Sequence, residues 1–240
     1  MAMITEGNPA ESDIKQRGVF RTDDEGRVVQ YEFGRLWPDG RHDITYVLRY
    51  EYADGRVART EKQARLGGEF RPIGDSEYSY DADGRAIQQV NHSLDEVTGE
   101  FRESTKRFRY DTSGRLVETL QSDSATTYEY DETGNVVREE YALQGSVTLV
   151  RNFTYDRSFN PMWGPPPTYY GLIAVSGYGS SPYNLSGWAA QEPGKAPASV
   201  SSITYELDER QYPLRRTEIV RNTSGRMTSE TVVSEFAYAD

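Results

Sequence analysis

The sequence lacks cysteine and contains only two histidines, His42 and His92. Without cysteine the chain can form no disulfide, thiol nucleophile or thiolate metal site, although this absence leaves the redox compartment open. Large apolar side chains are also few, because 17 Val, 12 Leu, 8 Ile and 8 Phe make 45 of 240 residues. That share lies near the level of about one fifth at which charged chains become disordered, so a large oily core is excluded.

Long apolar runs and an excess of positive charge are lacking as well. No stretch of about 18 apolar residues exists, so the sequence predicts no transmembrane segment. Residues 1 to 18 also lack the apolar centre of a signal peptide. The 38 acidic and 27 basic side chains give a net charge of −11, which repels phosphate backbones. Nucleic acid is therefore excluded as a partner.

Aromatic residues are abundant instead. The chain has 18 Tyr and 3 Trp, and such a composition is typical of folded chains rather than disordered ones. A length of 240 residues suits one domain or two small ones. We predict a single β domain over residues 19–240. Residues 1–18, with Gly7, Asn8 and Pro9, are interpreted as a flexible arm.

One phrase, aromatic-x-Tyr-Asp-x-x-Gly-Arg, recurs along the chain. Complete copies occupy residues 78–85 and 108–115. The copy at 128–135 has Asn for Arg, the copy at 20–27 has Thr for Tyr, and the copy at 50–56 is one residue shorter. Degenerate copies begin at Phe153, Tyr205 and Phe236. A repeated phrase of this kind is stronger support for a fold than any local propensity.

Each copy has the chemistry of a β-hairpin turn. Aromatic-x-Tyr places two rings on one strand face, and Asp-x-x-Gly is typical of a tight turn closed by a glycine at positive φ. The structural turn residues are Gly26, Gly55, Gly84, Gly114 and Gly134. We therefore predict an all-β fold, an antiparallel β-meander built from YD-type hairpin repeats in a curved or open sheet.

An arginine follows four of the turn glycines, at positions 27, 56, 85 and 115. Its guanidinium group could stack on the tyrosine of a neighbouring strand or pair with the aspartate of its own turn. Both alternatives give the arginines a structural role.

These phrases resemble the YD repeats of the rearrangement-hot-spot family, closely over residues 20–161 and loosely over residues 200–240. The resemblance implies long antiparallel sheets that curl into shells. The repeats are unevenly spaced, and Asn160-Pro161 follows Tyr155-Asp156. In both respects the chain is most similar to the short secreted YD-repeat lipoproteins of Bacteroidetes. This similarity implies a secreted, periplasmic or cell-surface location in a bacterium, with a lipid anchor on a precursor cysteine that this sequence does not contain.

The repeat stops in the segment 161–199, where the composition changes to Pro, Gly, Ser, Trp and Tyr. We predict an irregular insertion there. Its aromatic residues could form a stacking platform for sugar rings, or fold back to cover an open end or face of the sheet. The candidate ligand-binding residues are Trp163, Tyr169, Tyr170, Tyr178, Tyr183 and Trp188.

No catalytic or metal-binding pattern is evident. His42 and His92 have no neighbours at triad or metal-ligand spacing, so structural roles are predicted for both. A glycosidase pair such as Asp123 with Glu139 could be chosen only arbitrarily among 38 acids. The acidic turns provide fewer oxygen ligands than calcium takes. The sequence thus predicts no enzyme activity, no metal and no cofactor.

The leading hypothesis is a non-catalytic binding or scaffolding module of the bacterial cell envelope, with a glycan or another polypeptide as its partner. The first alternative is a structural shell or spacer segment related to YD-repeat toxin shells. The second is a carboxylate-dependent glycoside hydrolase. The oligomeric state is left open.

Overall fold

The computed structural model describes residues 2–6, 15–37, 39–95, 97–159, 181–211, 213–223 and 228–237. These residues form strands, turns and bends, and no helix occurs among them. The described part of the chain accordingly offers no helix that could cross a membrane. The prediction of an all-β fold is confirmed.

The chain divides into two compact units, each described by itself. Unit 1 comprises residues 1–107 with 234–240, and unit 2 comprises residues 108–233. In chain order the strands are β1 (Ala2–Glu6), β2 (Lys15–Thr22), β3 (Val28–Leu36), β4 (His42–Ala53), β5 (Arg56–Leu66), β6 (Glu69–Tyr80), β7 (Ala86–Leu94), β8 (Phe101–Tyr110), β9 (Leu116–Gln121), β10 (Ser124–Tyr130), β11 (Val136–Leu143), β12 (Ser146–Phe159), β13 (Tyr183–Gln191), β14 (Ser199–Leu207), β15 (Pro213–Asn222) and β16 (Thr228–Ala237).

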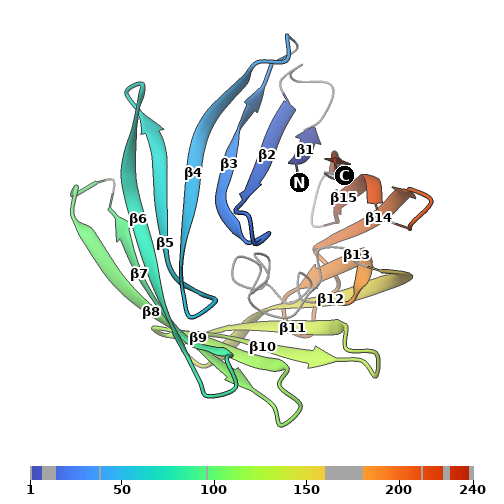
Figure 1. Cartoon of the computed structure of the whole chain (residues 1–240). Helices are drawn as coiled ribbons and strands as arrows, with labels where there is room; N and C mark the ends of the chain where they lie inside the picture. Colours follow the sequence, from blue (N-terminus) through green and yellow to red (C-terminus); the bar gives the residue numbers. More distant parts are fainter. Residues whose placement is uncertain are drawn as a thin grey trace. The chain divides into compact units, whose positions relative to one another are not determined.

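Within each unit, every strand pairs with the next strand of the chain. In unit 1 this antiparallel pairing runs without a crossover from β1 to β8, as can be followed in Figure 1. In unit 2 it runs from β9 to β15. The predicted antiparallel meander is therefore confirmed, and it needs only short turns because antiparallel neighbours can be joined by hairpins.

Two segments differ from the sequence interpretation. The arm predicted over residues 1–18 includes β1 and the start of β2, which pair from Ala2 with Val19 to Thr5 with Gln16. Strand pairing uses backbone groups, so a polar segment can join a sheet without an apolar side chain pattern. The insertion predicted over residues 161–199 includes β13, which pairs with both β12 and β14. The single domain predicted over residues 19–240 stays a prediction.

A β-bulge precedes the turn in six repeats. The register shifts between Glu51 and Tyr52, and again between Ser79 and Tyr80. The same shift occurs before Thr22, Tyr130, Tyr155 and Leu207. An extra residue at a bulge bends the strand and re-aims the following side chain. The bulge therefore sets the direction of the second aromatic position in the phrase.

The two faces of the sheet in unit 1 differ in chemistry. Tyr50, Thr60, Ser76 and Asn91 are successive cross-strand partners and form a row on one face. The adjacent row, Arg49–Glu61–Asp75–His92, lies on the other face and consists of charged or titratable groups. We call the first the aromatic face and the second the charged face. Neighbouring strands thus bury tyrosine on one side and pair opposite charges on the other.

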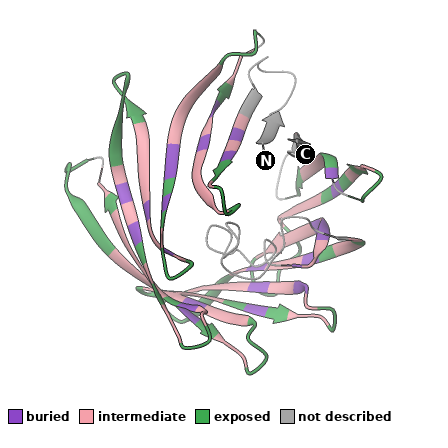
Figure 2. Cartoon of the chain, viewed as in Figure 1, coloured by how far each residue is buried: buried purple, intermediate pink, exposed green. Residues whose placement is uncertain are grey.

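The buried residues follow the repeat. Figure 2 shows them as short stretches within strands. In unit 2 the core cluster is Tyr128, Val136, Phe153, Leu185 and Ile203. Tyr128 and Phe153 occupy the first aromatic position of their phrases, and Val136 is the second residue after the turn glycine. The same few repeat positions therefore supply the core, which explains how a chain with few aliphatic residues can fold.

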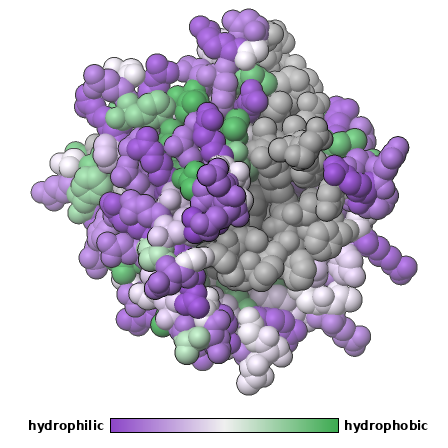
Figure 3. Space-filling model, viewed as in Figure 1, coloured by the Kyte–Doolittle hydropathy of each residue, from purple (hydrophilic) through white to green (hydrophobic). Residues whose placement is uncertain are grey.

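Hydrophilic side chains predominate over the described surface that Figure 3 shows. This agrees with the net charge of −11 and a mean hydropathy of −0.77.

Candidate functional site

The most repeated structural feature is the YD corner, the turn that follows each Tyr-Asp pair. At Asp81, one carboxylate oxygen accepts the backbone amide of Arg85 at 2.8 Å, and the other accepts Nε of Arg85 at 2.7 Å. The amide of Gly84 donates to the carbonyl of Asp81 at 3.0 Å. Asp111 holds Arg115 in the same way, at 2.9 and 2.8 Å. The turn aspartate thus ties together both ends of its own hairpin.

These contacts change the titration of the turn aspartates. The backbone amide of Arg85, followed by its guanidinium group, lowers the pKa of Asp81. The amide of Arg115 similarly lowers the pKa of Asp111. Hydrogen bonds to a carboxylate favour its charged form, so these turns are held most firmly when the aspartates are ionised.

The turn glycines adopt a backbone conformation that favours glycine. Their φ angles lie between +72° and +90° at Gly26, Gly55, Gly84, Gly114 and Gly134. In the degenerate copy after Asp208, Gln211 takes this place at φ +67°. A side chain costs roughly 1–2 kcal/mol in this region, which accounts for glycine in the regular copies.

In four YD corners the tyrosine connects its hairpin to the preceding one. The hydroxyl of Tyr52 donates to the carbonyl of Val28 at 2.9 Å, and that of Tyr80 donates to Val57 at 2.7 Å. Each acceptor is the second residue after the preceding turn glycine. We call this series the corner ladder. In unit 2 it comprises Tyr130 to Leu116 and Tyr155 to Val136, both at 2.7 Å. We include the 3.0 Å bond from Tyr205 to Leu185, although Tyr205 is the first aromatic residue of its degenerate copy and Leu185 follows no turn glycine.

The arginine after the turn glycine adds a second connection. The guanidinium carbon of Arg27 lies 5.0 Å from the ring centroid of Tyr52, and that of Arg115 lies 5.1 Å from Tyr130. Arg27 and Arg115 also pair with their own aspartates at 2.7 and 2.8 Å. Both roles considered for these arginines are therefore present together.

The corner at Gly134 is an exception, because Asn135 replaces the arginine. Its side-chain oxygen accepts the amide of Tyr183 at 3.3 Å. The hydroxyl of Ser181 donates to the Tyr155 oxygen at 2.9 Å and accepts the amide of Val136 at 3.1 Å. Asn135 and Ser181 are 2% and 0% exposed, so the returning chain is packed against this corner.

Unit 2 also contains two carboxylates that are mostly shielded from solvent. Glu139 is 5% exposed and pairs with Arg151 at 2.5 Å. Glu218 is 13% exposed, pairs with Arg216 at 2.5 Å and accepts the indole Nε1 of Trp188 at 2.8 Å. Each acid therefore has a cationic partner, which is what a buried charge requires.

The predicted ligand-binding residues are only partly located. Trp163, Tyr169, Tyr170 and Tyr178 lie outside the described residues. Tyr183 and Trp188 are in β13, where Trp188 is directly paired with Phe153 and packs against the core cluster. A sugar-binding platform by all six residues stays a prediction.

The two histidines lie in unit 1. His92 is 3.1 Å from Asp75 through Nδ1 and 3.5 Å from Glu103 through Nε2, on the charged face. Nε2 of His42 lies 3.2 Å from the carbonyl oxygen of Arg17. Among the described residues, no group of three or more acidic or imidazole side chains could hold a metal ion.

Comparison with known proteins places these features in a family. The Teneurin YD-shell family model matches residues 20–158. The search of curated proteins found no match.

Solved structures with a similar chain path include a porin-like protein from Bacteroides uniformis. It is 14% identical, the alignment covers 98% of this chain and 96% of that chain, and the TM-score is 0.66. A porin-like protein from Bacteroides vulgatus is 13% identical, the alignment covers 98% of this chain and 97% of that chain, and the TM-score is 0.41. The Photorhabdus luminescens Tc holotoxin pore is 14% identical, the alignment covers 90% of this chain and 15% of that chain, and the TM-score is 0.25. The first of these structures shares the fold.

Proposed function

Because the chain belongs to the Teneurin YD-shell family, we propose that it is a non-catalytic structural segment of a shell that encloses or presents another polypeptide. The corner ladder is the observation that carries this proposal. At five positions it ties a hairpin to the one before by a tyrosine hydroxyl–carbonyl bond, so that repetition extends a wall.

The environment of the acids supports a structural role over hydrolysis. Glu139 is engaged by Arg151, and Glu32 by Arg21 at 2.8 Å. Asp123 is exposed and bonds through its carboxylate to Gln144 at 3.3 Å. A glycosidase needs one carboxyl that holds a proton and one that attacks or activates water. Carboxylates that are paired with arginine or exposed to solvent do not fit these roles.

The location that we propose is extracellular or at the bacterial cell surface. The family assignment and the porin-like name of the Bacteroides uniformis structure support it. A lipid anchor would belong to a precursor cysteine, as in the short YD-repeat lipoproteins. Fractionation of the native host, with metabolic labelling by a lipid analogue, tests both parts of this assignment.

Site-specific photo-crosslinking in the native host tests the shell function. A crosslinking amino acid at Gln89 would lie on the aromatic face, since Gln89 is the cross-strand partner of Tyr78. The matched control is Glu77, which is exposed on the charged face of the same two strands. We expect one defined polypeptide to be captured from Gln89 and not from Glu77. Equal capture from both positions, or capture from neither, would contradict the proposal.

Glycan binding is the other function that the sequence suggested. Trp188 is a poor probe of it, because its ring packs on the core and its indole is bonded to Glu218. Trp163→Ala is the better variant. Unchanged glycan-array binding in this variant, or no binding by the parent protein, would reject the aromatic platform.

A further inference from the structure

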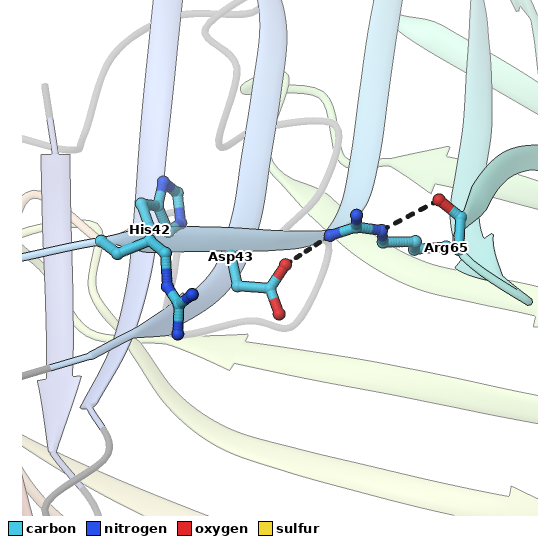
Figure 4. A pocket seen from close by; sticks show the side chains of 5 residues that line it. His42, Asp43 and Arg65 are labelled. Atoms are coloured by element: carbon cyan, nitrogen blue, oxygen red, sulfur yellow. Dashed lines mark hydrogen bonds and ion pairs between the residues drawn. The ribbon is translucent and has the colours of Figure 1, made fainter.

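Unit 1 contains a hollow at the strand ends opposite the YD corners. Its volume is about 570 Å³, and it is lined by Arg41, His42, Asp43, Arg65 and Gly68. The first three residues belong to the start of β4 and the turn before it, and the last two to the end of β5 and the turn after it. Figure 4 shows Arg65 extended towards Asp43. The volume lies within the range of about 300–1,000 Å³ typical of small-molecule sites.

The lining carries a local excess of positive charge on an acidic protein. Arg41 and Arg65 face a single acid, Asp43, whereas the whole chain has a net charge of −11. Arg65 is fixed by Asp43 and by a 3.2 Å bond from Nε to the carbonyl of Gly68. These contacts leave other guanidinium N–H groups for a ligand, since arginine has five.

Arg41 is held in a different way. Its guanidinium carbon lies 5.2 Å from the ring centroid of Trp37, and within the described part of the chain it forms no ion pair. The turn itself is fixed by the amide of Arg41, which donates to Asp39 at 3.0 Å. An exposed arginine with no carboxylate partner, positioned by an aromatic ring, is well suited to bind an oxyanion.

Other groups around the hollow have unused hydrogen-bonding capacity. The carbonyl of Arg17 can only accept a hydrogen bond, so Nε2 of His42 is the donor in their 3.2 Å contact. Nε of Arg17 and Nε1 of Trp37 are buried donors without a partner among the described residues. Each of these two residues contacts a residue of the lining. A ligand with many acceptors and some hydroxyl donors would match this set.

We propose that this hollow binds an anionic saccharide, with its oxyanion on Arg41 and Arg65 and its hydroxyls towards His42 and Asp43. Paired arginines recognise a carboxylate or phosphate group by charge and geometry. The volume exceeds what a free inorganic anion fills, and the mixed donors and acceptors suit a sugar ring.

Calorimetric titration of the full chain tests the site. The probes are digalacturonate, neutral digalactose and inorganic phosphate. Arg41→Gln removes one charge without disturbing a described ion pair, and Arg107→Gln is the control because Arg107 is exposed on β8 and outside the lining. We expect digalacturonate to bind, with affinity reduced roughly tenfold or more in Arg41→Gln and unchanged in Arg107→Gln.

If Arg41→Gln unfolds at the same temperature as the parent protein, its lower affinity cannot be due to a loss of folding. Arg65→Gln provides a second variant of the site. Phosphate binding as tight as digalacturonate binding would overturn the saccharide assignment in favour of a free oxyanion. Binding of digalactose as tight as that of digalacturonate, an equal loss of affinity in Arg41→Gln and in the Arg107→Gln control, or no binding of any probe at millimolar concentration would overturn the site.

Discussion

The guanidinium carbon of Arg56 lies 5.5 Å from the ring centroid of Tyr80, one repeat further along the chain. A Cβ atom added at Gly84 would lie 2.8 Å from a guanidinium nitrogen of Arg56. The glycine of one corner therefore leaves room for the arginine of the preceding corner, in addition to adopting a positive φ.

This relationship predicts unequal costs for two glycine substitutions. Gly26 and Gly84 have similar φ angles of +77° and +83°, but only Gly84 has a neighbour within 4 Å of the added Cβ. Both alanine variants should lose about 1–2 kcal/mol of unfolding free energy. Gly84→Ala should lose roughly a further 0.5–1 kcal/mol, because Arg56 must move from Tyr80. Urea unfolding measures both, and equal losses would mean that the arginine contact contributes nothing.

Restoring the consensus arginine at the exceptional corner should destabilise the protein. Asn135 is 2% exposed and bonds to the amide of Tyr183, so a longer side chain would displace the returning chain. We expect Asn135→Arg to cost about 2 kcal/mol or more through overpacking and lost hydrogen bonds. The reverse change, Arg115→Asn, affects a half-exposed side chain and should cost less. A neutral or stabilising Asn135→Arg would contradict the assigned packing.

The turn aspartates should make the protein sensitive to acid. The pKa of Asp81 and of Asp111 is lowered in the folded state, so each contributes stability above its unfolded pKa, about 3.9, that is lost as pH falls further. Asp81→Asn should be less stable than the parent at pH 7, and the difference should shrink towards pH 2. Unfolding monitored by circular dichroism at both pH values checks this. A difference that is independent of pH would exclude the ionic contribution.

Buried tyrosines should limit stability at high pH. Burial raises the pKa of Tyr46 and of Tyr128 to about 12. Their neutral forms are favoured in the folded state, so this contribution is complete below the unfolded pKa of about 10 and is lost as pH rises through about 12. Tyr46→Phe should therefore lose less stability than the parent between pH 10 and 12. An identical alkaline profile would show that Tyr46 does not contribute.

The hairpin chemistry could be predicted because it is local. The Asp-x-x-Gly phrase specifies its turn within five residues. The stacking of Arg27 and Arg115 on tyrosine rings follows from the tyrosine of the next repeat. The bulge before each tyrosine was not predicted, because it depends on pairing with the next strand. Without the bulge, the hydroxyl–carbonyl bond of the corner ladder could not be inferred from alternation alone.

The features that could not be predicted from the sequence depend on packing between residues far apart in the chain. Ser181 reaches the amide of Val136, 45 residues away, and no local pattern marks either residue. Within β13, a Cβ at Gly187 would lie 2.7 Å from the Ser201 carbonyl, so the glycine that suggested a loop instead permits close strand packing. Glu139, which the sequence did not distinguish from the other acids, is buried and paired with Arg151.

Unfolding free energies of the Tyr→Phe variants at positions 52, 80, 130, 155 and 205 would test the central claim most directly. Each change removes a single hydroxyl from the corner ladder, and Tyr46→Phe is the control, since no partner for its hydroxyl lies among the described residues. We predict losses of about 1 kcal/mol for each of the five and little or no loss for the control. Equal effects at all six positions would contradict the view that these hydroxyl–carbonyl bonds hold successive hairpins together.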